Sequence, residues 1–360
     1  MLETWKADER LSEILKICLA ADGEVQELLR KWESKYDVSI IDGGLIRYIP
    51  FLYKRLHDLK IDSRDYDILR GAYFKSWWVQ MVFHKKNLDF LGSMTDDFPR
   101  FSLLKGIALQ NTIYAPDSRT RPCEDVDIFV LPKHVGEAIR YLQQLGFTHD
   151  SPYSLDYVMR FRKSVSFVKD DILLDLNWGL YEYSKHNNYL SRMNYREVSV
   201  DENVFFILDD TYNLLHTFLH GTGWNSTPST RWILDAALLI RKGDINWVEF
   251  ERAVIENGWQ YPLSLQINYL EEFGITIPAI TKSRICAIKP EFFNKAMYFY
   301  QRQPSRLARR LCRLIYSDYL AYITNRNLNN SIINYLRIEV LVFKSFNVEY
   351  FNSLRRLLRK

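Results

Sequence analysis

The spacing of hydrophobic positions divides the chain into two helical regions with a mixed region between them. Up to about residue 95 the spacing is that of helices, with an apolar stripe formed by Leu11, Ile14, Leu15, Cys18 and Leu19. A long helix is expected to begin near Asp62 or Ser63 and to run through Tyr66, Leu69, Tyr73 and Trp77. Helical spacing returns at Asp209–His220, Pro228–Arg241, Trp247–Asn257 and further towards the end of the chain.

Between these regions the spacing is that of strands. Phe101–Leu104 is a short apolar run, and Asp125–Leu131 alternates before it becomes apolar, as a strand that enters a core does. A meander is expected from the runs Val158–Phe161, Val165–Val168 and Ile172–Leu176. Helices are expected after Lys105-Gly106 and over Val135–Leu145, where Gly146 is a typical C-cap residue.

These elements predict an α+β fold, a small mixed sheet with flanking helices. We expect a helical N-terminal region over residues 1–95 and an α/β core over 96–200. A helical domain that completes a cleft is expected over 201–280, followed by a basic helical region over 281–360.

The composition excludes several classes of protein. Hydrophobic residues make up 47% of the chain and charged residues 26%, which is typical of globular proteins and excludes a mainly disordered or collagen-like chain. No stretch reaches the roughly 18 uncharged apolar residues of a membrane span, and no secretory signal is visible. The cysteines Cys18, Cys123, Cys286 and Cys312 form no CxxC pair, so we expect a cytoplasmic protein without zinc or disulfides.

The charge is distributed unevenly along the chain. Lys289–Lys360 holds 14 Lys and Arg against 4 Asp and Glu, a net charge of +10, whereas the whole chain carries +4. The rest of the chain is therefore acidic, at −6. The basic segment is expected either to dock on this acidic body or to bind RNA or an anionic surface.

Two carboxylates at the start of one predicted strand are the first candidate for chemistry. Asp125 and Asp127 are separated by one residue, so in a strand both side chains lie on the same face. Adjacent anions repel each other unless a cation lies between them, and Mg²⁺ prefers such oxygen ligands. The alternative is a pair of solvated acids at an exposed strand start.

Two neighbouring features strengthen the metal interpretation. Lys105-Gly106 joins a predicted strand to a helix, an arrangement whose free N–H groups suit a phosphate. Asp175 lies within an otherwise apolar strand, where an acid is costly unless it is paired. The three acids meet if the two strands are neighbours, and the alternative is a salt bridge from Asp175 to Arg160 or Arg162.

Together these residues resemble the nucleotidyltransferase superfamily with the DNA polymerase beta fold, and in particular its uncharacterised bacterial nucleotidyltransferase family. The resemblance covers about residues 95–275 and rests on Leu104-Lys105-Gly106-Ile107-Ala108-Leu109, Tyr114, Arg121, Asp125-Val126-Asp127-Ile128-Phe129-Val130, Leu145-Gly146-Phe147, Asp175-Leu176-Asn177-Trp178, His216, His220, Arg231-Trp232-Ile233-Leu234-Asp235 and Trp247.

Two positions depart from the family pattern. Lys105 precedes a single glycine where Gly-Ser or Gly-Gly is usual, and Asn177 replaces a histidine. Because the acidic triad is intact, we interpret the chain as an active enzyme with an altered acceptor pocket.

The resemblance implies transfer of a nucleotide from an NTP, with ATP as the favoured donor, by means of two Mg²⁺ ions. Asp125 and Asp127 would share both ions, and Asp175 would bind the catalytic ion and orient or deprotonate the acceptor hydroxyl. Lys105 and Gly106 would hold the β- and γ-phosphates. Arg121 would neutralise the triphosphate or form a structural pair with Glu124.

Two helical pairs are candidates for substrate binding. His216 and His220 have the spacing of a metal pair, but HExxH is absent, so a packed or substrate-facing pair is favoured. Arg231 and Asp235 either form an i, i+4 ion pair or line the cleft. His220, Arg231 and Asp235 are therefore predicted to contact substrate.

Three functions remain open at the level of sequence. The first is an Mg²⁺-dependent nucleotidyltransferase acting on a small molecule, peptide or protein. The second is a toxin-like RNA or tRNA nucleotidyltransferase that holds its substrate with the basic C-terminal segment. The third is a non-catalytic nucleotide-binding scaffold.

Overall fold

The computed structural model describes residues 6–38, 44–94, 98–115, 117–151, 154–181, 188–222 and 230–287. The basic segment predicted to be helical lies outside the described residues from position 288 onward. Within the described ranges, none of the helices combines the length and the apolar character needed to cross a membrane.

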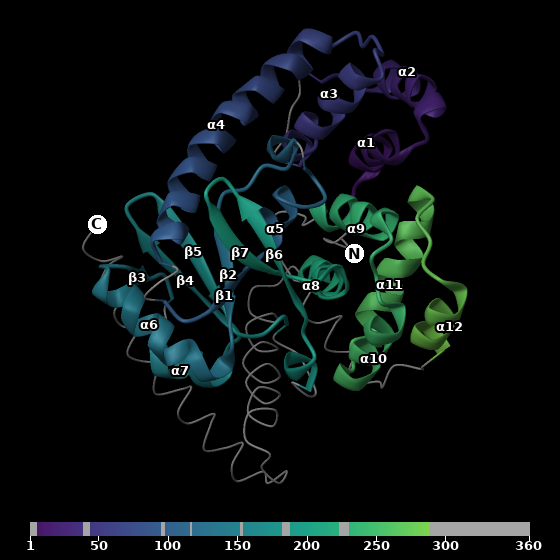
Figure 1. Cartoon of the computed structure of the whole chain (residues 1–360). Helices are drawn as coiled ribbons and strands as arrows, with labels where there is room; N and C mark the ends of the chain where they lie inside the picture. The colour runs from purple at the N-terminus through teal and green to yellow at the C-terminus, as the bar shows by residue number, and fades with distance from the viewer. Residues whose placement is uncertain are drawn as a thin grey trace, which may run out of the picture.

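Helices precede and follow a central sheet (Figure 1). Those before it are α1 (Glu9–Leu19), α2 (Val25–Lys35), α3 (Ile49–Asp58) and α4 (Tyr66–Ser93). Those after it are α8 (Asp210–Thr222), α9 (Arg231–Lys242), α10 (Trp247–Asn257), α11 (Gln260–Leu270) and α12 (Ala279–Ala287). Helix α1 begins where the Asp8 side chain accepts a hydrogen bond from the Leu11 N–H, the usual N-cap contact. The stripe predicted near the N-terminus and the long helix through Tyr73 are both confirmed.

The sheet of the described chain has seven strands in the order β3-β4-β5-β2-β1-β7-β6. The strands are β1 (Phe101–Leu104), β2 (Val126–Val130), β3 (Thr148–His149), β4 (Ser164–Lys169), β5 (Ile172–Asn177), β6 (Tyr195–Val200) and β7 (Asn203–Leu208). The pairs β2–β5 and β1–β7 are parallel, and the other neighbours are antiparallel. Helices α5 (Lys105–Gln110), α6 (Val135–Gln144) and α7 (Leu155–Phe161) are inserted between strands. A mixed α/β fold with flanking helices is therefore confirmed.

Two elements differ from the expectation. Val158–Phe161 was predicted as a strand of a meander, but it is part of helix α7, with Val158 buried and Met159 exposed. A run of four residues has too few positions for its period to distinguish a helix from a strand. The hairpin β6–β7 was not predicted, and it crosses the division expected between residues 200 and 201.

Two hydrophobic cores hold these layers together. One core joins α1–α3 to α8–α11, so the helical regions before and after the sheet share a single interior. The other lies between the sheet and helices α4 and α6 and includes Leu103, Ile128 and Leu142. Helix α4 runs diagonally from the N-terminal helices to the sheet (Figure 1), and it contributes Leu69 to the first core and Leu88 to the second. The candidate site lies where these two parts meet.

Candidate active site

The pairing of β2 with β5 brings the three predicted acids together. Asp127 on β2 lies directly opposite Asp175 on β5. Asp125, two residues before Asp127, presents its carboxylate to the same place, because side chains along a strand alternate between faces. One oxygen from each of the three carboxylates lies within 4.8 Å of the others. The acids therefore form the cluster that their spacing predicted.

The cluster carries an excess of negative charge in a largely enclosed place. Asp127 is 2% exposed, and burial raises its pKa to about 7 although the Lys105 ammonium acts in the opposite direction. Asp125 and Asp175 raise this pKa further by repulsion. Three convergent carboxylates are the hard oxygen donors that Mg²⁺ prefers, and a bound cation would relieve their repulsion. The residues present therefore fit a divalent metal ion.

Lys105 is the cation that already contacts this cluster. Leu104 is opposite Asp127 in the β1–β2 pair, so the next residue along the chain reaches the acids, and the Lys105 ammonium donates to Asp127 Oδ1. Burial lowers the pKa of Lys105, but the carboxylates outweigh burial and raise this pKa above its ordinary value. Its backbone has a φ of 46°, a left-handed conformation that is costly for a residue with a side chain. This strained turn directs the ammonium towards the acids.

Gly106 follows at the start of α5, where there is no space for a side chain. A Cβ atom at this position would lie 2.4 Å from Cys123 Sγ and 2.9 Å from Arg121 Nη1. Both neighbours are buried and fixed in place. The glycine is therefore required because the turn packs directly on the loop that leads into β2.

We expect Gly106→Ala to destabilise the fold by about 1–3 kcal/mol, the usual effect of overpacking a closed interior. Urea unfolding measures this effect, and Gly106→Ala combined with Cys123→Ala should recover most of the loss. Gly136→Ala on α6 is the matched control, because a Cβ there meets nothing within 4 Å. An equal loss in the control would contradict the steric explanation.

Arg121 is held by a buried ion pair rather than presented to solvent. Its Nε and Nη2 atoms donate to the two carboxylate oxygens of Asp235, at 2.9 and 2.7 Å. The Tyr114 hydroxyl donates to the same carboxylate, at 2.7 Å. A structural pair was one of the roles predicted for Arg121, but its partner is Asp235 on α9 and not Glu124. Tyr114 and Arg121, both part of the motif quoted above, thus converge on one acid.

Asp235 does not form the helical pair with Arg231 that the spacing suggested. Its oxygens are bonded to Arg121 and Tyr114, and Arg231 instead donates to the carbonyl oxygen of Pro122. The contacts from Arg121 and Arg231 join the start of α9 to the loop before β2. Sequence spacing along one helix could not reveal a pairing across 114 positions.

A cavity of about 360 Å³ opens at this junction between the sheet and the helices. All nine predicted site residues line it: Lys105, Gly106, Arg121, Asp125, Asp127, Asp175, His220, Arg231 and Asp235. The sequence reasoning did not identify Arg47 and Thr217, which line the same cavity. Thr217 adjoins the predicted His216, but Arg47 belongs to a segment that carries no motif.

His216 and His220 lie on α8 with their ring centroids 6.2 Å apart, in an edge-to-face arrangement. Burial and the Lys105 charge lower the pKa of His216 to about 3. Desolvation of the ring and the same charge lower the pKa of His220 well below its ordinary value, although the residue as a whole is exposed. Both rings are therefore neutral at pH 7. In the described residues no third ligand joins them into a metal-binding group, and His220 alone reaches the cavity.

Two polar side chains on the sheet position the acids. Asn177 donates from Nδ2 to Asp127 Oδ1 at 3.3 Å and to the Asp175 carbonyl oxygen at 2.9 Å. Ser166 on β4 donates its hydroxyl to Asp175 Oδ1. The residue that replaces the usual histidine of the motif thus ties β5 to β2, and Ser166 was not identified from sequence.

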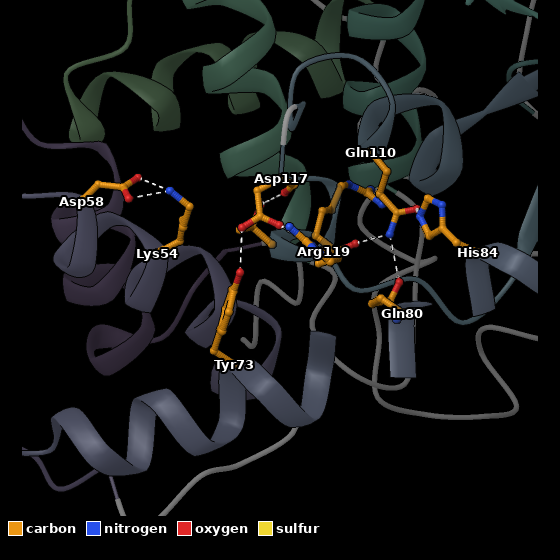
Figure 2. Close-up of polar contacts among 10 residues, drawn as sticks. Lys54, Asp58, Tyr73, Gln80, His84, Gln110, Asp117 and Arg119 are labelled. Carbon is orange, nitrogen blue, oxygen red and sulfur yellow. Dashed lines mark hydrogen bonds and ion pairs between the residues drawn. The ribbon is translucent and has the colours of Figure 1, made fainter. Parts of the chain in front are cut away.

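The loop before β2 is fixed from behind by α4 and α5. Gln80 accepts from the Cys123 N–H and donates to the Cys123 carbonyl oxygen, both at 2.9 Å. Figure 2 shows Gln110 placed between Gln80 and His84, and Gln110 also donates to the Arg121 carbonyl oxygen at 2.6 Å. The side-chain amides of Gln80 and Gln110 thus form hydrogen bonds with backbone groups of the loop, so the position of the loop does not depend on a ligand.

Comparison with known proteins gives one match. The model of a family described as uncharacterised nucleotidyltransferase matches residues 50–274. This range begins in α3 and ends after α11, so it includes the whole sheet and the acidic cluster. No curated protein and no solved structure matches the chain.

Proposed function

Because the chain belongs to this uncharacterised nucleotidyltransferase family, we propose that it transfers the NMP part of an NTP, with ATP as the favoured donor, to an acceptor hydroxyl and releases pyrophosphate. The observation that carries the proposal is the cluster of Asp125, Asp127 and Asp175 on the wall of the cavity, beside the Lys105-Gly106 turn. The acceptor is proposed to be a small molecule, a peptide or a protein, and the protein to act in the cytoplasm.

The three acids would hold Mg²⁺, and two bound ions would supply positive charge to the attacking and leaving oxygens. Asp125 and Asp127 would hold both ions, and Asp175 would hold the ion on the acceptor side. A bond forms between the acceptor oxygen and the α-phosphorus, while the bond from this phosphorus to the bridging oxygen of pyrophosphate breaks. Asp175, which Ser166 already contacts, orients the acceptor hydroxyl as its proton leaves to solvent.

The test of this function is release of pyrophosphate from each of the four NTPs in the presence of Mg²⁺ and fractionated cell lysate. We expect release to require both the metal ion and one fraction, and EDTA to stop it. A chain that binds NTP but releases no pyrophosphate with any fraction would be a nucleotide-binding scaffold instead.

An RNA acceptor is the second candidate, because the segment Lys289–Lys360 carries a net charge of +10. This segment lies outside the described residues. Binding of labelled tRNA to the full chain at increasing salt distinguishes the candidates, because neutralised phosphates make affinity fall steeply with salt. A chain that does not bind tRNA at low salt excludes this acceptor.

We expect Lys105→Ala to weaken NTP binding about tenfold to a hundredfold, or about 1.4–2.7 kcal/mol, the range of a charge-assisted hydrogen bond. The Lys105 ammonium lies beside the acidic cluster that the phosphates of the NTP must approach. Its contact with the phosphates is therefore made both before and during transfer. Such uniform binding changes apparent KM more than kcat. Turnover at saturating NTP should therefore survive.

Calorimetric titration of a non-hydrolysable NTP measures this change. Lys75→Ala on the exposed face of α4 is the matched control for loss of one positive charge. If the Lys105 and Lys75 variants bind NTP with the same affinity, Lys105 has no role in phosphate binding and serves only as the partner of Asp127.

A further inference from the structure

Within the part of the chain that the structure describes, two arginines in the cavity have no acidic partner, whereas Lys105 and Arg121 each have one. Arg47 ends the short turn Leu45–Arg47 before α3, and Arg231 is the first residue of α9. Both line the cavity, and they lie near enough for the Arg47 charge to lower the pKa of Arg231. Arg47 also lies outside the range matched by the family model. It therefore belongs to a part of the chain that the family motif does not cover.

The guanidinium of Arg231 is only partly satisfied. Its Nη1 atom donates to the Pro122 carbonyl oxygen, but its Nε atom is buried and has no hydrogen-bond partner among the described residues. Burial lowers the pKa of Arg231, and the nearby charges of Arg121 and Arg47 lower it further, although the Asp235 carboxylate acts in the opposite direction. An orphaned donor next to like charges is unfavourable unless an anion occupies the space beside it.

Among the described residues, no acid forms a hydrogen bond or an ion pair with Arg231. Asp235, one turn along α9, is already bonded to Arg121 and Tyr114. Asp127, which lines the same cavity, is bonded to Lys105. None of the residues that the structure describes gives Arg47 a hydrogen bond or an ion pair. The cavity lining thus contains the acidic cluster beside Lys105 and two arginines, Arg47 and Arg231, that make no direct ion pair with a described acid.

We infer that Arg47 and Arg231 form an anion subsite that binds a phosphate group. Guanidinium groups match phosphate geometry with two parallel N–H···O bonds, and both arginines line the cavity that a phosphate would enter. Identification of the ligand rests on the proposed function. The phosphate is either the terminal one of the NTP or one carried by the acceptor. In both cases the N-terminal region contributes a binding residue to the cavity of the family domain.

Calorimetric titration with inorganic pyrophosphate in EDTA tests the subsite without metal and without turnover. We expect Arg47→Met to weaken pyrophosphate binding about tenfold to a hundredfold, because one charge-assisted contact is lost. Arg47 has no partner among the described residues, so this variant should unfold at the wild-type temperature. Arg30→Met, on the exposed face of α2, removes the same charge away from the cavity and should bind as the wild type does.

Equal affinity of the wild type and Arg47→Met for pyrophosphate overturns the inference, and so does the absence of pyrophosphate binding by the wild type. Arg47→Lys should retain part of the affinity, since it keeps the charge but loses the planar fork.

Titration of a non-hydrolysable NTP with the same variants then identifies the source of the phosphate. Weaker NTP binding by Arg47→Met, with NMP binding unchanged, assigns the subsite to the terminal phosphate. Unchanged NTP binding together with weaker pyrophosphate binding assigns it to a phosphorylated acceptor. Substitutions of Asp125 or Asp127 test transfer itself, so failure of the proposed function and failure of the subsite give different results.

Discussion

Asp127→Asn is expected to reduce nucleotidyl transfer by about a thousandfold or more while the protein remains folded. The loss follows from the role of the carboxylate, because metal-borne stabilisation of the transition state is worth several kcal/mol and each 1.36 kcal/mol is tenfold in rate. Folding should survive because the amide has the same size and reduces the repulsion among the three acids. In this variant the Lys105 ammonium still lies near the carboxylates of Asp125 and Asp175, so its charge is not left without a counter-charge. Pyrophosphate release and thermal unfolding, measured on one preparation, check both statements.

The control for this prediction is Asp171→Asn, an acid at the exposed turn before β5 whose side chain is 93% exposed. It should transfer at the wild-type rate. An Asp127→Asn variant with full turnover would contradict the metal assignment, whereas a variant that is inactive because it is unfolded would show that Asp127 is needed for stability first.

Asp235→Ala is expected to lower the free energy of unfolding by about 3–5 kcal/mol, because it leaves the Arg121 charge buried without its partner. The side chains of Arg121 and Asp235 are only 7% and 5% exposed, so little of the lost contact can be replaced by water. Urea denaturation measures the change. The effect should be among the largest of any single substitution outside the apolar cores.

Two further variants show whether this loss comes from the unpaired charge. Arg121→Met combined with Asp235→Leu removes both charges and should recover most of the stability, because buried ion pairs can be replaced by apolar residues of similar volume. Glu27→Gln breaks an exposed ion pair on α2 and should have no measurable effect. A double variant as unstable as the single one would show that the hydrogen-bonded geometry, and not the charge, is what Asp235 supplies.

The acidic cluster could be predicted from sequence because its geometry is mostly local. Asp125 and Asp127 lie on one face because side chains alternate along a strand. For Asp175 to join them, the only further condition was that β5 be the neighbour of β2. The turn at Lys105-Gly106 was equally visible, since a strand, a glycine and a helix follow one another directly. For the Asp125 and Asp127 pair and for the Lys105-Gly106 turn, the relevant separation is one or two residues along the chain.

The missed features depend on contacts between distant segments or on runs too short to classify. Arg121 and Asp235 are 114 positions apart, and neither segment contains a pattern that indicates the other as its partner. Arg47 reaches the cavity only because the N-terminal helices share a core with α8–α11. The four residues Val158–Phe161 of helix α7, which include Arg160, are too few to show a period, and hairpin β6–β7 turns at Asp201-Glu202 without the glycine that usually marks such a turn.

The ion pair of Arg121 with Asp235 also determines how the cavity behaves between binding events. It joins the sheet wall of the cavity to the helical wall, so the walls separate only if a buried charge loses its partner. At a cost of about 3–5 kcal/mol, fewer than about one molecule in a hundred would hold the cavity open in this way. In nearly every molecule the cavity is therefore already formed when a ligand arrives. The apparent affinity is then not lowered by a population of molecules whose cavity must first close.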